Sequence, residues 1–214
     1  FALKNFLDNW GKDQTLLSTI IGENVLVLQK IIPLKSLFQY IEELKKCFYD
    51  YYGIHFTVAV SSEGFFEQLP VLYSEVLEYL EYRFYLGEGS IITKDDVVSS
   101  EKISELVANF DYQRLGLLIR SGNVNAVKKE MEEFFYRLNT YKSKLDIVRT
   151  LCVELYIFII RQGNTDNLNE YMKQVVELQT IDTISKMFAF ISSIAIEITE
   201  ANYKRTVQKN SKTI

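Results

Sequence analysis

Pairs of neighbouring carboxylates are the first residues of this chain that could do chemistry. General acid–base catalysis uses two acidic groups that face one reacting centre. Such pairs occur at Glu42–Glu43, Asp95–Asp96 and Glu132–Glu133. Consecutive residues of a helix do not face one another, and each pair falls on the polar side of its segment. We therefore interpret these pairs as solvated surface charges, and the sequence predicts no catalytic residues.

Nucleophilic catalysis has equally little to build on. The only histidine, His55, stands at the head of a predicted strand, where a packed or hydrogen-bonded structural role is the simplest interpretation. Ser61, Ser62 and Ser74 have no adjacent base, and the chain contains no nucleophile elbow. It also lacks a Walker loop and a dinucleotide-binding glycine motif, so we expect no cofactor-binding residues and no cofactor.

The two cysteines do not form a metal-binding pattern. Cys47 and Cys152 stand far apart in apolar helical segments, and no CxxC pair occurs. We expect buried, reduced thiols and no metal ligands, while a disulfide is the less favoured alternative.

Composition restricts the class of protein. The 214 residues are 48% apolar and 24% charged with two prolines, which is typical of a helix-rich globular chain of one large or two small domains. A net charge of −4 argues against a nucleic-acid surface, because phosphate binding needs clustered lysine and arginine. The apolar run at residues 187–196 is too short to span a bilayer, and no signal peptide is visible. We expect a cytoplasmic protein without membrane contact, and a chain excised from a longer one.

The elements of the first part alternate between helix and strand. A β-branched and aromatic run predicts a buried strand over residues 54–60. Pro70 then opens a helix whose predicted apolar stripe comprises Leu69, Leu72, Tyr73, Val76, Leu77, Leu80 and Phe84. A glycine turn at 87–89 leads to a short strand over residues 90–93.

The first fifty residues continue this alternation. Residues 2–21 predict a helix that leads into a strand over 24–30, and Pro33 opens a second helix that ends at Gly53. The order predicts an α/β layer over residues 1–94. Because the first helix otherwise has no strand ahead of it, we expect a missing strand before Phe1.

The sequence pattern changes after Lys94, where we place a domain boundary. Residues 95–214 carry helical periodicity without strand signals, which predicts an antiparallel bundle or an array of helical hairpins. The helix at 144–162 is apolar on most sides and is predicted to be central, and the last helix, from 181 to about 207, is the longest. Asn123, Ser143 and Asp166 are predicted N-caps, while residues 103–107 belong to the first helix of this part.

Aromatic residues crowd two predicted helices of the first part. They are Tyr40, Phe48, Tyr49, Tyr51, Tyr52, Tyr73, Tyr79, Tyr82, Phe84 and Tyr85. Core and half-buried rings are the simplest account. A helix–helix dimer surface or a small apolar ligand site is the sharper alternative, and sequence alone does not separate these accounts.

Residues 56–92 resemble the C-terminal half of a GGDEF-type fold. The stretch from Tyr73 through Tyr82-Arg83-Phe84 to Gly87-Glu88-Gly89 and Ile91-Ile92 is similar to the degenerate version of that fold in the middle region of AraC-family response regulators. Val76 stands where that pattern has alanine. The resemblance implies a degenerate cyclase-like α/β sandwich over residues 1–94, followed by an all-α helical bundle over 95–214.

The signature loop of active cyclases corresponds here to Ile21-Gly22-Glu23-Asn24-Val25. Only Gly22 and the acid Glu23 match, because Asn24 replaces the second acid. The chemistry of that loop needs closely placed carboxylates, so the resemblance implies a protein that is not an enzyme.

The later helices extend the resemblance. Residues 112–138, with the turn at 119–123, resemble the helices that follow in the same regulators, and residues 207–214 look like the lead-in to a paired helix-turn-helix domain. We therefore expect the regulatory, signal-relay segment of an AraC-family response regulator of a two-component system, with DNA bound by a downstream domain and a homodimer left open. A nucleotide-binding or cyclase domain and a helical adaptor for protein partners are the alternatives.

Overall fold

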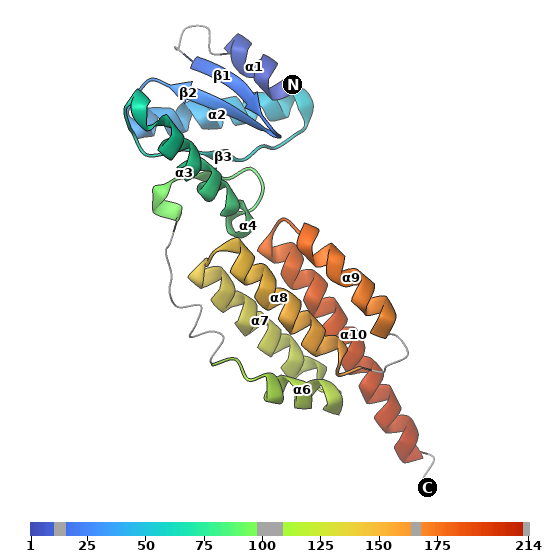
Figure 1. Ribbon diagram of the computed structural model, residues 1–214. Coiled ribbons are helices and arrows are strands. Elements are labelled where there is room, and N and C mark those ends of the chain that lie inside the picture. Colours follow the sequence, from blue (N-terminus) through green and yellow to red (C-terminus); the bar gives the residue numbers. More distant parts are fainter. Residues whose placement is uncertain (11–15, 98–108, 164–167, 212–214) are drawn as a thin grey trace.

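The chain folds into an α/β unit at one end and a helical bundle at the other (Figure 1). The computed structural model describes residues 1–10, 16–97, 109–163 and 168–211. Of the described residues, 72% are helical and a small share lies in strands, so the predicted combination of α+β structure and helical bundle is confirmed in this coarse form. Within the described residues the strands form two separate two-stranded sheets and no single cyclase-like sheet.

The N-terminal hairpin departs from the predicted helix over residues 2–21. Helix α1 covers Ala2–Trp10 only, and strand β1 (Leu16–Ile21) pairs antiparallel with β2 (Asn24–Gln29). The helix prediction was wrong here because a short apolar run fits both periods, and cross-strand pairing of β-branched residues decides between them. Gly22 has φ 61° at the first central position of the two-residue loop, where a type II′ turn takes glycine.

Helix α2 (Leu34–Tyr52) follows Pro33 as predicted and ends at Gly53, which adopts the left-handed conformation with φ 65°. The next strand is shorter than the predicted 54–60, because only β3 (Val58–Ala59) pairs, in parallel, with β4 (Ile91–Ile92). These strand residues are half-buried apart from Ile92, which is fully buried.

Helix α3 (Leu69–Glu81) keeps most of the predicted stripe half-buried, and its most buried residue was not part of that stripe. Tyr79 is its only buried residue, whereas Leu77 of the predicted stripe is 39% exposed. The helix ends at Glu81, and a separate turn of helix, α4 (Arg83–Leu86), follows Tyr82. The break redirects the chain, so that Phe84 leaves the face of α3 and packs elsewhere. Short 3₁₀ turns at Phe66–Gln68 and Lys94–Asp96 flank this region.

The bundle consists of helices with one shared core. They are α6 (Tyr112–Ser121), α7 (Val124–Tyr141), α8 (Leu145–Ile160), α9 (Leu168–Thr180) and α10 (Ile184–Ser211). Helix α8 is buried along most of its length and lies among α6, α9 and α10, as its apolar sequence predicted. Helix α10 is the longest, also as predicted, and packs on α6, α7 and α8.

The helix caps of the bundle follow the sequence in part. The Asn123 side chain accepts a hydrogen bond from the Ala126 amide at 3.2 Å, so the predicted cap is confirmed. Ser143 is not the cap of α8, because Lys144 holds that position, and the Ser143 hydroxyl is buried without a partner among the described residues. Asp166 and the predicted helix around residues 103–107 lie outside the described residues.

Candidate functional site

The hairpin that corresponds to the cyclase signature lies at the surface. Gly22, Glu23 and Asn24 are all exposed at the tip between β1 and β2. Among the described residues, no group of three or more histidine, cysteine, aspartate or glutamate side chains is placed to hold a metal ion. Glu23 therefore belongs to no such group in the part of the chain that the structure describes, and its loop is exposed at the tip of the hairpin.

The carboxylate pairs lie where the sequence predicted surface charge. Glu42 and Glu43 are exposed on α2, and Glu132 and Glu133 are exposed on α7. Asp96 has a local structural role, because its carboxylate accepts hydrogen bonds from the Thr93 amide at 2.9 Å and the Thr93 hydroxyl at 3.1 Å. This arrangement caps a 3₁₀ turn, so the Asp96 carboxylate is held by groups next to it in the chain.

The single histidine and both cysteines also have structural surroundings. The His55 ring stacks on Tyr49 with the ring centroids 4.3 Å apart, as the structural interpretation predicted. Both cysteines are free thiols, and Cys152 is buried as expected, whereas Cys47 is only half-buried. Burial raises the pKa of the Cys152 thiol to about 12, so this group stays protonated at neutral pH and is a poor nucleophile.

A closely packed contact joins α4 to the end of the bundle. Phe84 is 2% exposed and belongs to the core of the bundle, although it comes from the α/β unit. Next to it, the Tyr85 hydroxyl donates to the Ser143 carbonyl oxygen at 2.5 Å, just ahead of α8. Burial raises the pKa of the Tyr85 phenol well above its usual range, so it acts here as a hydrogen-bond donor. We call the contact made by Phe84 and Tyr85 the junction.

Charged groups surround the junction. The Lys186 ammonium, in the first turn of α10, lies 2.9 Å from a Glu88 carboxylate oxygen of the α/β unit and 2.9 Å from one of Asp182. The hydrogen bond from Lys186 lowers the pKa of the Asp182 carboxyl. These side chains are partly exposed, so the pairs orient the two parts more than they stabilise them.

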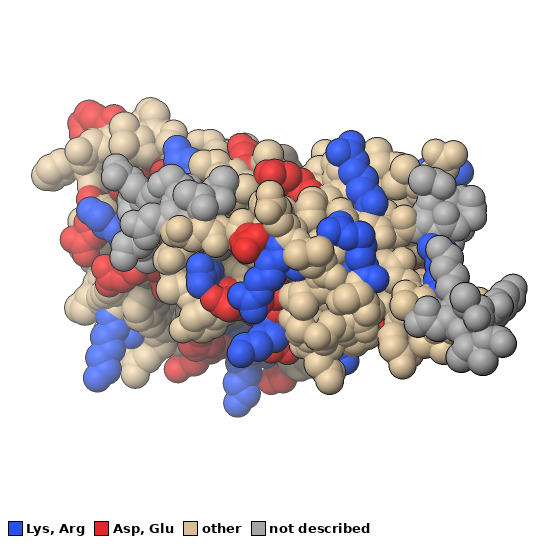
Figure 2. All heavy atoms as spheres, turned by 90° about the horizontal axis from the view of Figure 1, so that it is seen from below, with Lys and Arg blue, Asp and Glu red and all other residues tan. Residues whose placement is uncertain are grey.

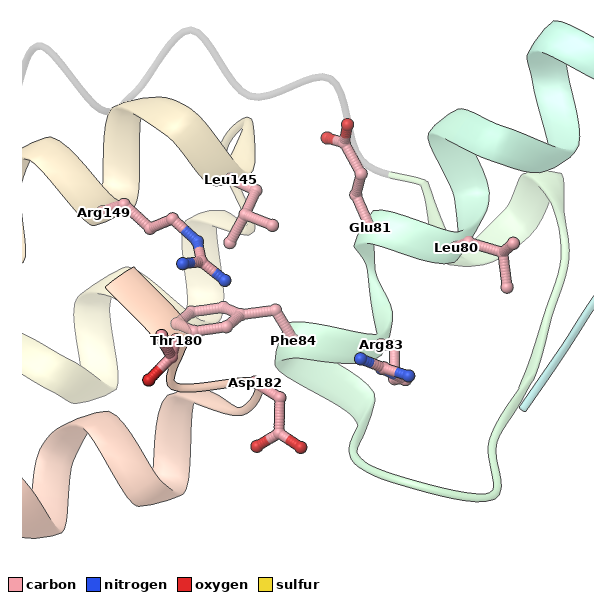
Figure 3. A pocket seen from close by; sticks show the side chains of 8 residues that line it. All are labelled: Leu80, Glu81, Arg83, Phe84, Leu145, Arg149, Thr180 and Asp182. Atoms are coloured by element: carbon pink, nitrogen blue, oxygen red, sulfur yellow. The ribbon is translucent and has the colours of Figure 1, made fainter. Parts of the chain in front are cut away.

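A small pocket of about 150 Å³ opens beside the junction. Its lining residues come from both parts of the chain: Leu80, Glu81, Arg83, Phe84, Leu145, Arg149, Thr180 and Asp182. Figure 3 shows the Phe84 ring projecting from α4 toward α8 and the start of α10, with the Arg149 guanidinium directed to the same space. Arg149 donates to the carbonyl oxygens of Gln179 and Ile181, the latter at 3.1 Å, and so holds the connection between α9 and α10.

The two acidic residues that line this pocket have pKa values shifted in opposite directions. Burial raises the pKa of the Glu81 carboxyl, and the negative charges of Asp146 and Glu78 add to the effect. On the other side of the pocket the pKa of Asp182 is lowered. Two acids and two arginines of opposite charge line a space too small for a drug-sized ligand, so the arrangement suits a contact between two parts of a protein better than a binding site.

Helix α10 connects the junction to the opposite end of the bundle (Figure 1). Its 28 residues span about 42 Å at the usual helical rise. Near the far end, the Asn202 side chain donates to the carbonyl oxygens of Ile119 at 3.2 Å and Gln162 at 3.1 Å. It thereby ties the ends of α6 and α8 to α10. Beyond this point α10 continues past its neighbours.

Sequence reasoning missed the junction. It assigned Phe84 to the apolar stripe of a helix packed on the sheet, and it predicted that Ser143 is the N-cap of the following helix. The available signal was the extra bulk at the helix end, Tyr82-Arg83-Phe84-Tyr85, ahead of a glycine that must stop the helix. Three aromatic rings within four residues exceed one helical stripe, so at least one ring had to pack on a second surface.

Comparisons with known proteins add no relative. No family model, no curated protein and no solved structure matches this chain. Within the described residues, no helix is both long and apolar enough to cross a bilayer. Figure 2 shows acidic and basic side chains intermixed on one face of the molecule.

Proposed function

We propose that this chain is a non-catalytic signal-relay segment of an AraC-family bacterial transcription regulator of the response-regulator type. In this proposal the α/β unit receives a change from an upstream input, and the bundle passes it to a downstream helix-turn-helix domain that binds DNA. The observation that carries the proposal is the junction, where Phe84 of the α/β unit is built into the core of the bundle. The family itself rests on the resemblance of residues 56–92 and 112–138.

The junction supports a mechanical role because it acts on the first turn of α10. Phe84 and Glu88 flank this turn, and Lys186 within it pairs with Glu88. A closely packed core does not deform continuously, so a shift of the α/β unit moves the helices that hold Phe84 or expels the ring. Either change alters the direction in which α10 leaves the bundle, and α10 is the element that continues toward the C-terminus.

The arrangement at Glu23 supports the absence of cyclase activity in this proposal. One exposed acid on a hairpin tip offers a divalent ion one carboxylate, whereas phosphate-bound magnesium sites use carboxylates held close together. The competing cyclase hypothesis predicts binding of GTP with magnesium. Calorimetric titration of the chain with GTP and magnesium separates the two, because a dissociation constant in the micromolar range contradicts the relay proposal.

The relay itself is tested in the natural full-length protein. Genomic DNA fragments retained by the protein are sequenced, and the affinity for the enriched sites is measured for the natural protein and two variants. We expect Phe84→Ala to change this affinity about fivefold or more, since allosteric coupling is usually of this size. Absence of enriched sites contradicts a DNA-binding regulator.

A matched control separates the junction from general damage. Phe66 belongs to the same α/β unit but is 77% exposed, so Phe66→Ala removes the same ring without opening a core. This variant is expected to bind the enriched sites like the natural protein. If both variants bind the sites with unchanged affinity, the junction does not communicate with the DNA-binding domain.

A further inference from the structure

The turn between α7 and α8 holds a lysine in an unusual backbone conformation. Among the residues that the structure describes, Lys142 is the only one other than glycine with a positive φ, at φ 43° and ψ 48°. Its amide donates to the Leu138 carbonyl oxygen at 3.1 Å and so closes the last turn of α7. The left-handed conformation costs free energy for any residue with a Cβ. The surroundings of the turn therefore hold it in a strained state.

The next residue, Ser143, is buried without the hydrogen bond that its sequence predicts. It is 5% exposed, and its hydroxyl has no partner among the described residues. A buried hydroxyl without a partner is destabilising, because it loses its hydrogen bonds to water. The sequence from Ser143 to Asp146 fits a capping box, in which the serine hydroxyl accepts a hydrogen bond from the Asp146 amide. The structure leaves this box unformed, since Lys144 holds the N-cap position without a side-chain hydrogen bond.

The Ser143 carbonyl oxygen is bound from outside the bundle. It accepts the hydrogen bond of the Tyr85 hydroxyl at 2.5 Å. If α8 began one residue earlier, this oxygen would accept from the Ile147 amide, four residues further along. That amide donates instead to the Lys144 carbonyl oxygen at 3.1 Å, only three residues back. Tyr85 thus occupies an acceptor that a longer α8 would use. We call this the docked arrangement.

A rotation at Lys144 leads to the alternative, which we call the released arrangement. Lys144 has φ −52°, a helical value, but ψ 136°, an extended one. Rotation of this ψ to about −40° adds Lys144 to α8. The Ser143 hydroxyl then accepts from the Asp146 amide, and its carbonyl oxygen accepts from the Ile147 amide. Lys142 takes up the change of chain direction as it leaves the left-handed region.

The docked arrangement has contributions of both signs. It buries the Phe84 ring, which is 2% exposed. It also brings the Glu81 carboxyl near the start of α8. Burial there raises the pKa of this carboxyl, the negative charge of Asp146 raises it further, and Lys144 offsets part of the effect. Docking therefore combines one large apolar contact with several local costs, which is the composition expected of an element with two states.

We propose that the turn between α7 and α8 is a two-state switch. In the docked state Tyr85 holds the Ser143 carbonyl oxygen, and α8 begins at Leu145. In the released state Tyr85 withdraws, Ser143 caps α8, and α8 gains one residue. The change reaches α10, because Arg149, about one turn into α8, donates to the Ile181 carbonyl oxygen ahead of α10 at 3.1 Å.

NMR spectroscopy of the 214-residue chain tests the switch. The Cα chemical shift of Lys144 distinguishes extended from helical backbone, and relaxation dispersion measures the population of the minor state. Tyr85→Phe removes the hydroxyl and keeps the ring. We expect it to raise the ratio of released to docked molecules about tenfold, since one buried hydrogen bond has about this effect. Tyr136→Phe, which removes a hydroxyl from a 71% exposed residue of α7, is the control and should leave the ratio unchanged.

An unchanged Lys144 shift in Tyr85→Phe, without detectable exchange, overturns the proposal. A second substitution separates the switch from a serine that only fills space. In the Tyr85→Phe background, Ser143→Ala removes the cap of the released state and is expected to lower the ratio about fivefold. Lys142→Gly should act in the same direction, because glycine relieves the strain of the docked state alone. If neither substitution moves the Lys144 shift back toward its extended value, the proposal is wrong.

As a mechanism of signal relay, the switch rests on the proposed function, but its two states do not require DNA. The two proposals therefore fail separately. Unchanged spectra of Tyr85→Phe overturn the switch and leave a relay through displacement of Phe84 intact. Absence of enriched DNA sites overturns the proposed function and leaves the two states of the turn intact.

Discussion

The two parts of this molecule bury apolar residues to very different degrees. In the bundle, helices α7, α8 and α10 share a core in which side chains such as Val127, Leu155 and Ile191 have no exposed surface. In the α/β unit the strands are mostly half-buried, and apolar residues as large as Phe65 are more than three-quarters exposed. The difference shows that the helices of the bundle, together with the inserted Phe84 ring, close its core, whereas the sheets of the α/β unit keep surfaces suited to further contacts.

The contact between the two parts follows the same asymmetry. The α/β unit contributes Phe84 to the core of the bundle, while the bundle contributes charged and polar groups such as Lys186 and Arg149 to the junction. The bundle therefore holds the α/β unit through the inserted Phe84 ring, the Tyr85 hydrogen bond and the Lys186–Glu88 ion pair. We expect unfolding to begin in the α/β unit, because local stability follows the density of buried contacts.

The largest expected effect comes from truncating a leucine in each of the two parts. Leu155 is fully buried in α8, so Leu155→Ala is expected to lower the free energy of unfolding by about 2–5 kcal/mol. Leu28 is half-buried in β2, and Leu28→Ala is expected to cost about 1 kcal/mol or less, since little apolar area returns to water. Urea unfolding of the two variants measures both values. Equal losses would show that the two parts are equally well packed.

A second pair of variants probes the close approach between α10 and the turn after α6. Gly122 and Gly53 both end helices in the left-handed conformation, with φ 76° and 65°. A Cβ at Gly122 would lie 2.6 Å from the Tyr203 Cβ, whereas nothing lies within 4 Å at Gly53. Alanine at Gly53 therefore costs about 1–2 kcal/mol from the backbone alone.

Gly122→Ala is expected to cost more than Gly53→Ala, because the added methyl group must also displace α10. The difference in thermal midpoint between the two variants measures this steric part. If the two midpoints coincide, α10 moves freely away from the turn, and the inference that its far end is tightly attached is wrong.

The third prediction concerns the polar anchor of α10. Asn202→Ala removes the donor to the Ile119 and Gln162 carbonyl oxygens and is expected to destabilise the bundle by about 1–2 kcal/mol. Asn139→Ala is the control, since Asn139 is an exposed residue of α7 without such bonds. Chemical denaturation monitored by far-UV circular dichroism measures the loss of helix directly. A loss no greater than that of the control contradicts the anchor.

The smallest effect is a pH dependence of opposite sign on the two sides of the pocket. The pKa of Asp182 is lowered by Lys186, so its stabilising contribution is present above its ordinary value of 3.8 and is lost as the pH falls. The pKa of Glu81 is raised by burial, so its contribution is lost as the pH rises through and above 4.5. Asp182→Asn should therefore weaken the fold at pH 7, and Glu81→Gln should strengthen it slightly.

Both shifts are expected to amount to less than about 1 kcal/mol, because the groups are partly exposed. Thermal unfolding at pH 7 and at pH 3 in low salt measures them. Both effects should shrink at pH 3, where the two carboxyls are mostly protonated in the unfolded chain. Effects of the same sign at pH 7 would contradict the described surroundings of the pocket.

Local sequence determined the helical elements of this protein and several of their ends. Pro33 and Gly53 mark the ends of α2, and Asn123 caps α7. The apolar surface of α8 predicted its central position. These signals act within one or two turns of a helix. The exposed carboxylate pairs and the structural surroundings of His55 were equally accessible from the sequence. Such features depend on neighbours close along the chain.

Only the tertiary structure decided the strand at residues 16–21, the buried face of α3 and the junction at Phe84. A short apolar run is compatible with helix and strand until a partner strand, here β2, pairs with it. The buried face of α3 and the direction of Phe84 depend on the break at Tyr82 and on a bundle that begins more than twenty residues later in the sequence. Contacts between distant segments set these features, and no pattern within a single segment contains that information.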